Sequence, residues 1–536
     1  MSVASGRCPI LGAVAPPQPR LADALAALSL AGDLGMGFAL EHGLRVTYLA
    51  GTLARELGLG VEERANVFYV ALLHGIGCTA DAHDLARVFG ADEIALKTAG
   101  AVLDDDDRAA ALRFVLGRAG SSGRMLLRPV AIARALAQGE ATFRDGLRAH
   151  CEVGELLASR VGVPAVARDG LLMLFERWDG KGVGRLAGGE VPRAARIFHV
   201  AKTAIAHFDH AGAEAAVAAV GAQAGRVLEP ALAEAFLDLA AGHDVLAALG
   251  EPDLWDRALD LEPAELRLVL DGERAGSLFE AIADVADIKS PAYVGHSRAV
   301  AALAVGAGKR VGFAASELEV LGPAALAHDL GRVSVPNTIL DKAGPLTPPE
   351  WEAVRLHAYH TERVLVRSAA LAPYAPVAGL HHERLDGSGY HRGVRAPVLP
   401  PTARVLAAAD VYQALTSARP HRAPFEPDRA ATLARGEARA GRLDGEAVEA
   451  VIATARGLPA RRIASGGRLS EREVEVLELL ASGLTTREVA SRLSITEKTV
   501  RHHVEHIYDK LGVSTRAAAV VAAIGAGRIG DGIAPG

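Results

Sequence analysis

The sequence predicts a mainly α-helical protein, with two related helical domains in tandem followed by a small C-terminal helical domain. Apolar residues recur at steps of three and four, as in LEVLGPAALAHDLG and EVEVLELLASGL, which is the period of amphipathic helices. Histidines reappear at matching intervals in two parts of the chain, which indicates an internal repeat. The glycine-rich break ASGGRLS then precedes a last group of short helical patterns.

Length and composition limit the class of protein. The 536 residues are half apolar, which suits three or four domains. Three scattered cysteines predict a reducing, cytoplasmic setting, and no apolar run approaches the roughly 18 residues of a membrane span. The net charge of −6 confines any nucleic-acid contact to a local surface. Residues 1–20 lack the pattern of a secretory signal and are expected to form a disordered lead-in, and the acidic run Asp104–Asp107 a solvated loop.

Histidine spacing defines the two copies. His42 and His74 are 32 residues apart, as are His296 and His328. The neighbouring text agrees, with ALLHGIG against ALAHDLG and FERWDGKG against HERLDGSG. A change in the offset between the copies gives the first one about 47 extra residues in its middle. We therefore place the first domain at residues 21–245 and the second at residues 275–460.

The second copy collects residues that bind metals. Neutral imidazole and carboxylate suit divalent iron, manganese, zinc or nickel. A lone histidine is more often a hydrogen-bonded core residue, but seven ligand residues in one domain favour two ions that share a bridge. The residues are His296, His328, Asp329, His357, His381, His382 and Asp410.

Four segments between Phe279 and Arg422 carry these ligands: HSRAVA, HDLGRVSVPNTILDKAGPLTPPEWEAVRLH, HHERLDGSGY and ADVYQALTSARPHR. In this order they closely resemble the HD-GYP family of cyclic dinucleotide phosphodiesterases. The resemblance implies an HD-type helical domain with two divalent transition-metal ions, iron or manganese, bridged by Asp329. It assigns His296, His328 and Asp410 to one ion, and His357, His381 and His382 to the other.

The resemblance also implies roles in hydrolysis. Two ions about 3.5–4 Å apart can lower the pKa of a shared water and hold phosphate oxygens, with Asp329 and Arg332 as the catalytic residues. The glycines of DGSG are expected to let the backbone pass close to the ligand, because glycine has no Cβ. The implied substrate-binding residues are Arg332, Asp386, Gly387, Tyr390, Arg419 and Arg422.

The second copy departs from the family pattern at a few positions. Arg332 stands where the family has lysine, His391 where it has proline, and Gln413 where it has aspartate. Ala292 occupies the position of a glutamate that binds a third metal in some members. We interpret His391 as altering the loop rather than adding a ligand. The intact ligand set favours an enzyme. Arg332, His391 and Gln413 favour the alternative, a transcription factor whose HD-GYP-like domain senses a nucleotide or metal without useful turnover.

The first copy lacks most of the ligands. Gly75 aligns with the bridging Asp329, and the other lost positions hold Leu174, Phe175 and Lys202. The histidines that remain are His42, His74 and His150. We predict a degenerate HD-type domain without metal, which acts as a pseudo-dimeric partner or as a ligand sensor. The alternative is a rebuilt metal site that uses His83 or Asp84.

Residues 461–468 form the expected linker, and residues 469–530 predict a DNA-binding domain. Ser470 and Glu473 give a capping-box signal. Thr485 and Thr496 are expected N-caps of two further helices, separated by the turn LSIT. The charge pattern alone also suits a generic helical bundle. Nevertheless, the text from Leu469 to Ile524 resembles the LuxR-type helix-turn-helix domain along its whole length.

That resemblance implies a recognition helix in the major groove and binding to DNA as a homodimer, because one helix reads only a half-site. The expected DNA contacts are Lys498, Thr499, Arg501, His502, His503 and Lys510. The sequence as a whole thus predicts a cytoplasmic regulator in which hydrolysis of cyclic di-GMP or a related nucleotide is coupled to transcriptional output.

Overall fold

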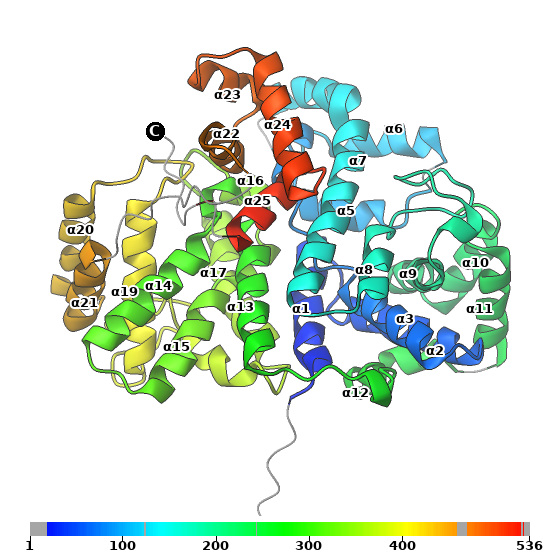
Figure 1. The fold of residues 1–536 in the computed structure, drawn as a ribbon, viewed down its shortest axis with the longest axis horizontal. Coiled ribbons are helices and arrows are strands. Elements are labelled where there is room, and N and C mark those ends of the chain that lie inside the picture. The colour runs from blue at the N-terminus through cyan, green and yellow to red at the C-terminus, as the bar shows by residue number, and fades with distance from the viewer. Residues whose placement is uncertain are drawn as a thin grey trace, which may run out of the picture.

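The computed structural model describes residues 19–104, 106–122, 125–242, 244–457, 469–526 and 529. Helices form the regular structure of these residues, which contain no β-strand, and this confirms the predicted fold class. Figure 1 shows two helical halves side by side, with the C-terminal helices seated over the upper junction between them. The predicted linker and all but the end of the predicted lead-in fall outside the described residues.

The first half contains twelve α-helices in its described residues. They are α1 (Leu21–Met36), α2 (His42–Glu56), α3 (Val61–Leu73), α4 (Ala82–Phe89), α5 (Glu93–Gly100), α6 (Arg108–Arg118), α7 (Arg128–Arg160), α8 (Ala165–Leu172), α9 (Arg193–Ala211), α10 (Ala213–Gln223), α11 (Pro230–Gly242) and α12 (Leu254–Leu259). The described residues of the second half form α13 (Gly272–Asp287), α14 (His296–Arg310), α15 (Ala315–Ala327), α16 (Asn337–Leu340), α17 (Pro348–Leu365), α18 (Ala375–Ala378), α19 (Pro401–Thr416), α20 (Pro427–Arg439) and α21 (Gly445–Gly457).

The two halves begin their central helices in the same way. His42 and His296 are the first residues of α2 and α14, and each follows a residue at positive φ, Glu41 or Gly295. His74 and its counterpart His328 each follow the last residue of a helix and bond through Nδ1 to the carbonyl oxygen three residues earlier. Equal local geometry at equal spacing supports the internal repeat.

The first half carries its extra residues between α3 and α8. They form α4, α5, α6 and the N-terminal part of the 33-residue α7. The described aspartates of the acidic run within them, Asp104, Asp106 and Asp107, are exposed, as expected of a solvated loop, and two of them also pair with arginines. Asp106 accepts hydrogen bonds from Arg177 at 2.8 Å and Arg226 at 2.6 Å, and Arg226 also bonds to Asp104. These ion pairs connect the inserted segment to the loop that follows α8, through Arg177, and to the turn between α10 and α11, through Arg226.

Buried polar contacts join the halves. The side chains of Lys289 and Glu93 are almost fully buried, with Nζ and Oε1 2.8 Å apart, and Glu93 also accepts the backbone N–H of Asn337. Buried charges are tolerated when they are paired and hydrogen-bonded. α1 packs against the 3₁₀ helix η6 (Leu330–Ser334) and against α17 of the second half, while α13 packs against α7 of the first half. A single apolar cluster spans both halves.

The C-terminal domain consists of α22 (Glu471–Ala481), α23 (Thr486–Arg492), α24 (Glu497–Leu511) and α25 (Arg516–Gly525). Its caps follow the sequence. Ser470 accepts a hydrogen bond from the N–H of Glu473, and Thr485 and Thr496 cap α23 and α24 in the same way. Val500 and Ile507 of α24 are buried, which fixes the inward face of that helix.

Candidate metal centre and DNA-binding surface

Asp329 lies at the centre of the predicted ligand set, and its two carboxylate oxygens face two different groups. Oδ2 lies 3.1 Å from Nε2 of His296 and 2.9 Å from Nε2 of His328. Oδ1 lies 3.2 Å from Nε2 of His357 and 3.6 Å from Nε2 of His381. All five side chains are buried. A carboxylate whose oxygens each serve one histidine group has the arrangement of a bridge between two cations.

Hydrogen bonds outside the cluster fix the direction of the imidazoles. Nδ1 of His328 and of His381 each lies 2.7 Å from a backbone carbonyl oxygen, and Nδ1 of His357 contacts the carbonyl of Val354. A carbonyl only accepts, so each Nδ1 carries a proton, and in the neutral form of the ring Nε2 directs its lone pair inward. His296 is held by Gln413, whose Oε1 is 2.5 Å from Nδ1. Such support is typical of metal-binding histidines.

The inward atoms lack partners of their own. Nε2 of His296, Nε2 of His328 and Oδ1 of Asp329 are buried without a hydrogen bond among the described residues, although buried polar atoms are nearly always satisfied. Nε2 of His357 faces Nε2 of His381 at 3.1 Å, and two lone pairs at this distance repel unless a cation or proton lies between them. These residues therefore fit divalent metals.

Asp410 of α19 lies beside both groups. Its Oδ1 is 3.3 Å from Nε2 of His296, and its Oδ2 is 3.8 Å from Nδ1 of His382. Burial alone would raise the pKa of Asp410, but the neighbouring histidines hold it well below its usual range. Burial lowers the pKa of His381 to about 4. Burial opposes the charged form of His328, but the Asp329 carboxylate raises the pKa of this histidine above its usual value. The centre thus places carboxylates beside imidazoles, and metals bind the deprotonated form of both.

Two arginines and a tyrosine border the cluster. Arg332 is buried and donates to Oδ2 of Asp329, and its guanidinium lies 3.8 Å from the centre of the Tyr293 ring. Arg419 lies 4.3 Å from the same ring and donates to the carbonyl of Ala292 at 2.8 Å. Sequence reasoning missed Tyr293, and the one signal available was its position three residues before His296.

A glycine of the DGSG loop allows a close approach within the protein. A Cβ on Gly389 would lie 2.4 Å from Cα of Glu383, so the missing side chain lets the loop pass close to its own backbone. Gly387 has φ +82°, and Asp386 is exposed and accepts hydrogen bonds from Ser388. Both residues therefore shape the turn.

Of the other residues considered in this region, Tyr390 lies beside the candidate metal ligands, whereas His391 and Arg422 make contacts outside the ligand cluster. The Tyr390 ring lies 4.6 Å from His382 and borders the metal ligands. His391 contacts Glu362 at 3.3 Å and belongs to neither ligand group. Arg422, expected to bind substrate, directs its guanidinium to backbone carbonyls at the end of α19, including that of Leu415 at 3.2 Å. The structure thus gives Arg422 a supporting contact with the backbone.

Comparison with known proteins agrees with this geometry. Residues 280–447 match the family model of the HD domain, and residues 467–523 match that of the bacterial regulatory proteins of the luxR family. The chain joins an HD domain to a luxR-family domain. It is homologous to the HD-GYP cyclic dinucleotide phosphodiesterases, as the resemblance implied.

Two curated relatives come from Vibrio cholerae serotype O1. The 3′3′-cGAMP-specific phosphodiesterase 3 is 29% identical over 419 residues, which cover 77% of this chain and 90% of the relative. The 3′3′-cGAMP-specific phosphodiesterase 1 is 34% identical over 180 residues, 34% of this chain and 42% of the relative. The longer match exceeds the HD and luxR domains together, so it includes much of the first half.

A solved structure extends the comparison to the fold. The crystal structure of a cyclic GMP-AMP-specific phosphodiesterase of V. cholerae superposes with a TM-score of 0.58 and 25% identity. It covers 82% of this chain and 99% of the other. The arrangement of both helical halves is therefore shared with that enzyme.

The first half has no counterpart of the HD-domain centre in its described residues. Both groups of three or more metal-binding side chains found among the described residues lie in the HD domain. Nζ of Lys202 lies 4.7 Å from the centre of the Phe175 ring, among residues aligned with the ligands. His83 pairs with Asp341 at 2.9 Å, and Asp84 pairs with Arg516 at 2.8 Å, so these two residues are used in contacts with other domains.

The buried histidines of the first half give a testable pH dependence. Burial and the nearby Lys202 charge lower the pKa of His199 to about 4. Below about pH 6.5 His199 binds a proton in the unfolded chain but not in the folded chain, so the free energy of unfolding falls by about 1.4 kcal/mol per pH unit down to about pH 4. Between pH 6.5 and 5, we expect the free energy of unfolding of His199→Gln to fall by about 2 kcal/mol less than that of the parent, as measured by urea unfolding. The exposed His210→Gln is the control, and parallel pH profiles for parent and His199→Gln would contradict this account.

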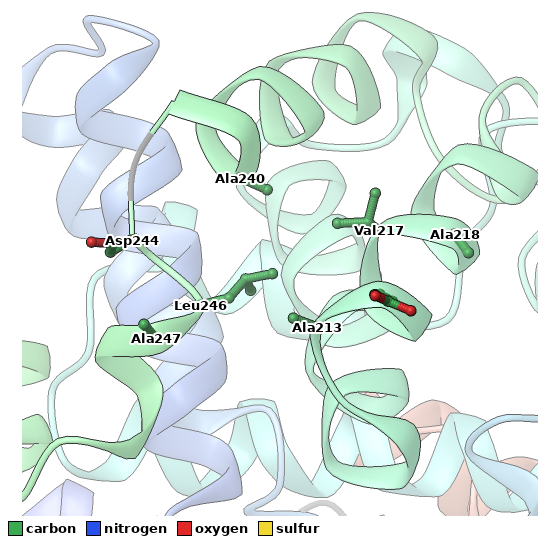
Figure 2. A pocket seen from close by; sticks show the side chains of 8 residues that line it. Ala213, Val217, Ala218, Ala240, Asp244, Leu246 and Ala247 are labelled. Atoms are coloured by element: carbon green, nitrogen blue, oxygen red, sulfur yellow. The ribbon is translucent and has the colours of Figure 1, made fainter.

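The hollow drawn in Figure 2 lies far in sequence from the HD-domain ligands. Its volume is about 490 Å³, and it opens between α10, α11 and the segment around Leu246. Alanines, Val217 and Leu246 line it, with Glu214 and Asp244 as its charged groups. A wall with carboxylates and no cation does not suit the phosphates of a nucleotide.

The luxR-family domain presents the predicted recognition surface on α24. Lys498, Arg501 and His502 are exposed, while Thr499 and His503 are half-buried. Nζ of Lys510 is 2.7 Å from both carboxylate oxygens of Glu473. The N-terminal half of α24 thus carries the accessible cations, whereas Lys510 is paired with the capping carboxylate of α22. None of the described helices is both long and apolar enough to cross a membrane.

Proposed function

We propose that the HD domain is a phosphodiesterase with two divalent metal ions, iron or manganese, that opens a cyclic dinucleotide by hydrolysis. The observation that carries this proposal is the bridging position of Asp329, with one oxygen toward His296 and His328 and the other toward His357 and His381. The homologues named above are cyclic dinucleotide phosphodiesterases.

Each residue of the centre has a physical task in this proposal. When bound, two ions activate water and stabilise charge on the phosphate oxygens. Asp329 and Asp410 would balance the charge of the cations. The histidines whose Nδ1 atoms are anchored would keep the ions in one geometry; these are His296, His328, His357 and His381. Arg332 and Arg419 supply positive charge at the border, which suits a phosphodiester anion and its more charged transition state. Tyr390 offers an aromatic face beside His382.

For the substrate, we favour 3′3′-cGAMP together with cyclic di-GMP, since both activities occur among the relatives. The products would be linear dinucleotides, formed by addition of water across one phosphodiester bond. The test is product analysis by chromatography with manganese- or iron-loaded protein. Turnover of either nucleotide supports the enzyme. Tight metal-dependent binding without any product would favour the alternative, a nucleotide sensor.

The second part of the proposal is a DNA-binding output. We propose that the chain binds its operator as a homodimer through the N-terminal half of α24, in the cytoplasm, and that the first half acts as a metal-free, pseudo-dimeric partner of the HD domain. Support comes from the luxR-family match and from the buried contacts between Lys289 and Glu93.

Arg501→Ala is expected to weaken DNA binding at least fivefold without changing metal content, because one contact to a base or phosphate contributes about 1–3 kcal/mol. Affinity should be measured at fixed salt, since phosphate contacts are salt-sensitive. Lys510→Ala is the matched control, because Lys510 is paired with Glu473, and we expect a smaller loss. Equal losses in both variants would contradict the proposed surface.

A further inference from the structure

A short segment connects the nucleotide site with the DNA-binding domain. It is η5 (Pro291–Tyr293), which leads through Val294 and Gly295 to the metal ligand His296. Ser290 caps it by accepting the N–H of Ala292 and donates to Asp341 at 2.5 Å. Both ends of this segment are therefore held in place, one of them by the candidate metal centre.

Tyr293 is the residue of η5 that contacts the candidate nucleotide site. Its ring contacts the guanidinium groups of both Arg332 and Arg419, at 3.8 and 4.3 Å from the ring centre, and it lies 5.9 Å from the His296 ring. Arg419 also holds the backbone of Ala292. Cations at an aromatic face are attracted to it, more strongly when they are desolvated. A shift of η5 would therefore move both proposed phosphate-binding cations.

The opposite side of η5 meets the DNA-binding domain. Val294 is buried within the apolar core of that domain, next to the described residues of α22 to α25. The turn between α22 and α23 rests on Pro291, because a Cβ built on Gly483 would lie 2.9 Å from Cγ of Pro291. Gly483 has φ +87°, which favours glycine at this turn. The DNA-binding domain thus packs directly against the segment that carries Tyr293.

Further contacts hold the DNA-binding domain in this position. Glu152 of α7 accepts hydrogen bonds from Ser514 and Thr515 at the start of α25. Arg516 pairs with Asp84 of α4 at 2.8 Å. Ala518 and Val521 of α25 belong to the core shared with the two halves, whereas other residues of α25 belong to the core of their own domain. Figure 1 shows α25 near the junction of the two halves, below α24, and α25 packs against α7, α22 and α24.

We propose that the seated DNA-binding domain supports the nucleotide site through η5, and that Tyr293 is the positioning residue that holds Arg332 and Arg419 for the phosphates. This inference rests on the proposed function. Seating and nucleotide binding then favour each other, because coupling between two equilibria is reciprocal. If the DNA-binding domain dissociates from η5 and the two halves, Tyr293 is no longer held in place and the affinity of the site for nucleotide falls.

The first test changes Tyr293 in the full chain, with 3′3′-cGAMP and cyclic di-GMP as probes. Tyr293→Ala is expected to raise KM at least fivefold while metal content stays at the parent level, and Tyr293→Phe to recover most of this loss because the ring is kept. A structural role alone would lower folded protein or metal content in both variants. Parental KM for Tyr293→Ala would overturn the proposal.

The second test weakens a contact between the DNA-binding domain and the first half that is remote from η5, the ion pair of Arg516 with Asp84. Arg516→Glu should raise KM at least fivefold, and the double variant Asp84→Arg/Arg516→Glu should restore it by exchanging the charges. Arg492→Glu, an exposed arginine of α23 away from these contacts, is the matched control and should behave as the parent. Unchanged KM in Arg516→Glu would overturn the proposal. If the parent hydrolyses neither nucleotide, the proposed function fails, and the Kd of each nucleotide replaces KM in the same comparison.

Discussion

Asp329→Ala is expected to remove most of the bound metal and to lower hydrolysis of a cyclic dinucleotide at least about 10³-fold. Both carboxylate oxygens of Asp329 face a histidine group, so one substitution takes a ligand from each ion. Lewis-acid stabilisation by metal ions contributes several kcal/mol, and each 1.36 kcal/mol is a factor of ten in rate. Elemental analysis gives the metal content, and chromatography gives the rate.

A matched pair of variants controls for general damage to the fold. His328 and His74 occupy equivalent positions in the two halves and bond to equivalent carbonyl oxygens. We expect His328→Ala to lose metal and activity and His74→Ala to retain both. Full metal occupancy in Asp329→Ala would refute the bridge, and equal metal loss in the two histidine variants would refute its restriction to the HD domain.

Arg332→Ala is expected to slow hydrolysis at least about tenfold while the metal content is kept. The guanidinium is buried beside Asp329 and Tyr293, where a cation aimed at developing phosphate charge typically contributes more than 1 kcal/mol. Burial opposes its charge, but the Asp329 carboxylate keeps the pKa of Arg332 above its usual value, so the group stays cationic.

Arg332→Lys separates charge from shape at this position. Lysine restores the positive charge and is the residue of the HD-GYP family pattern, so we expect it to recover part of the rate that Arg332→Ala loses. It cannot reproduce the planar, multidentate donors of arginine. A rate for Arg332→Ala equal to that of the parent, with every cyclic dinucleotide tested, would remove Arg332 from the mechanism.

Local sequence rules account for much of the fold. The capping residues Ser470, Thr485 and Thr496 stand where the structure begins its helices, because a cap depends on a few neighbouring residues. The histidines and aspartates that gather around Asp329 were also predictable as a set, since these residues at matching spacing are rarely all structural. The histidines form the two groups that the family resemblance implied, while Asp410 lies beside both groups.

Contacts between segments that are distant in the chain could not be predicted from the sequence. The pairing of Asp106 with Arg177 and Arg226 joins residues far apart in the chain, and the same is true of Lys289 with Glu93. The close approach of Gly389 to Glu383 was also not predictable, because the sequence does not show which atoms approach a missing Cβ. The seat of the DNA-binding domain on η5 depends on tertiary packing alone, which no periodicity records.

The most direct test of the account is anomalous diffraction from crystals of the manganese-loaded protein. We predict two anomalous peaks per chain, one between Oδ2 of Asp329 and the pair His296 and His328, and one between Oδ1 of Asp329 and the pair His357 and His381. No peak is expected among His42, His74 and His150. A peak at those three histidines, or the absence of paired peaks at Asp329 in fully loaded protein, would contradict a two-metal centre confined to the HD domain.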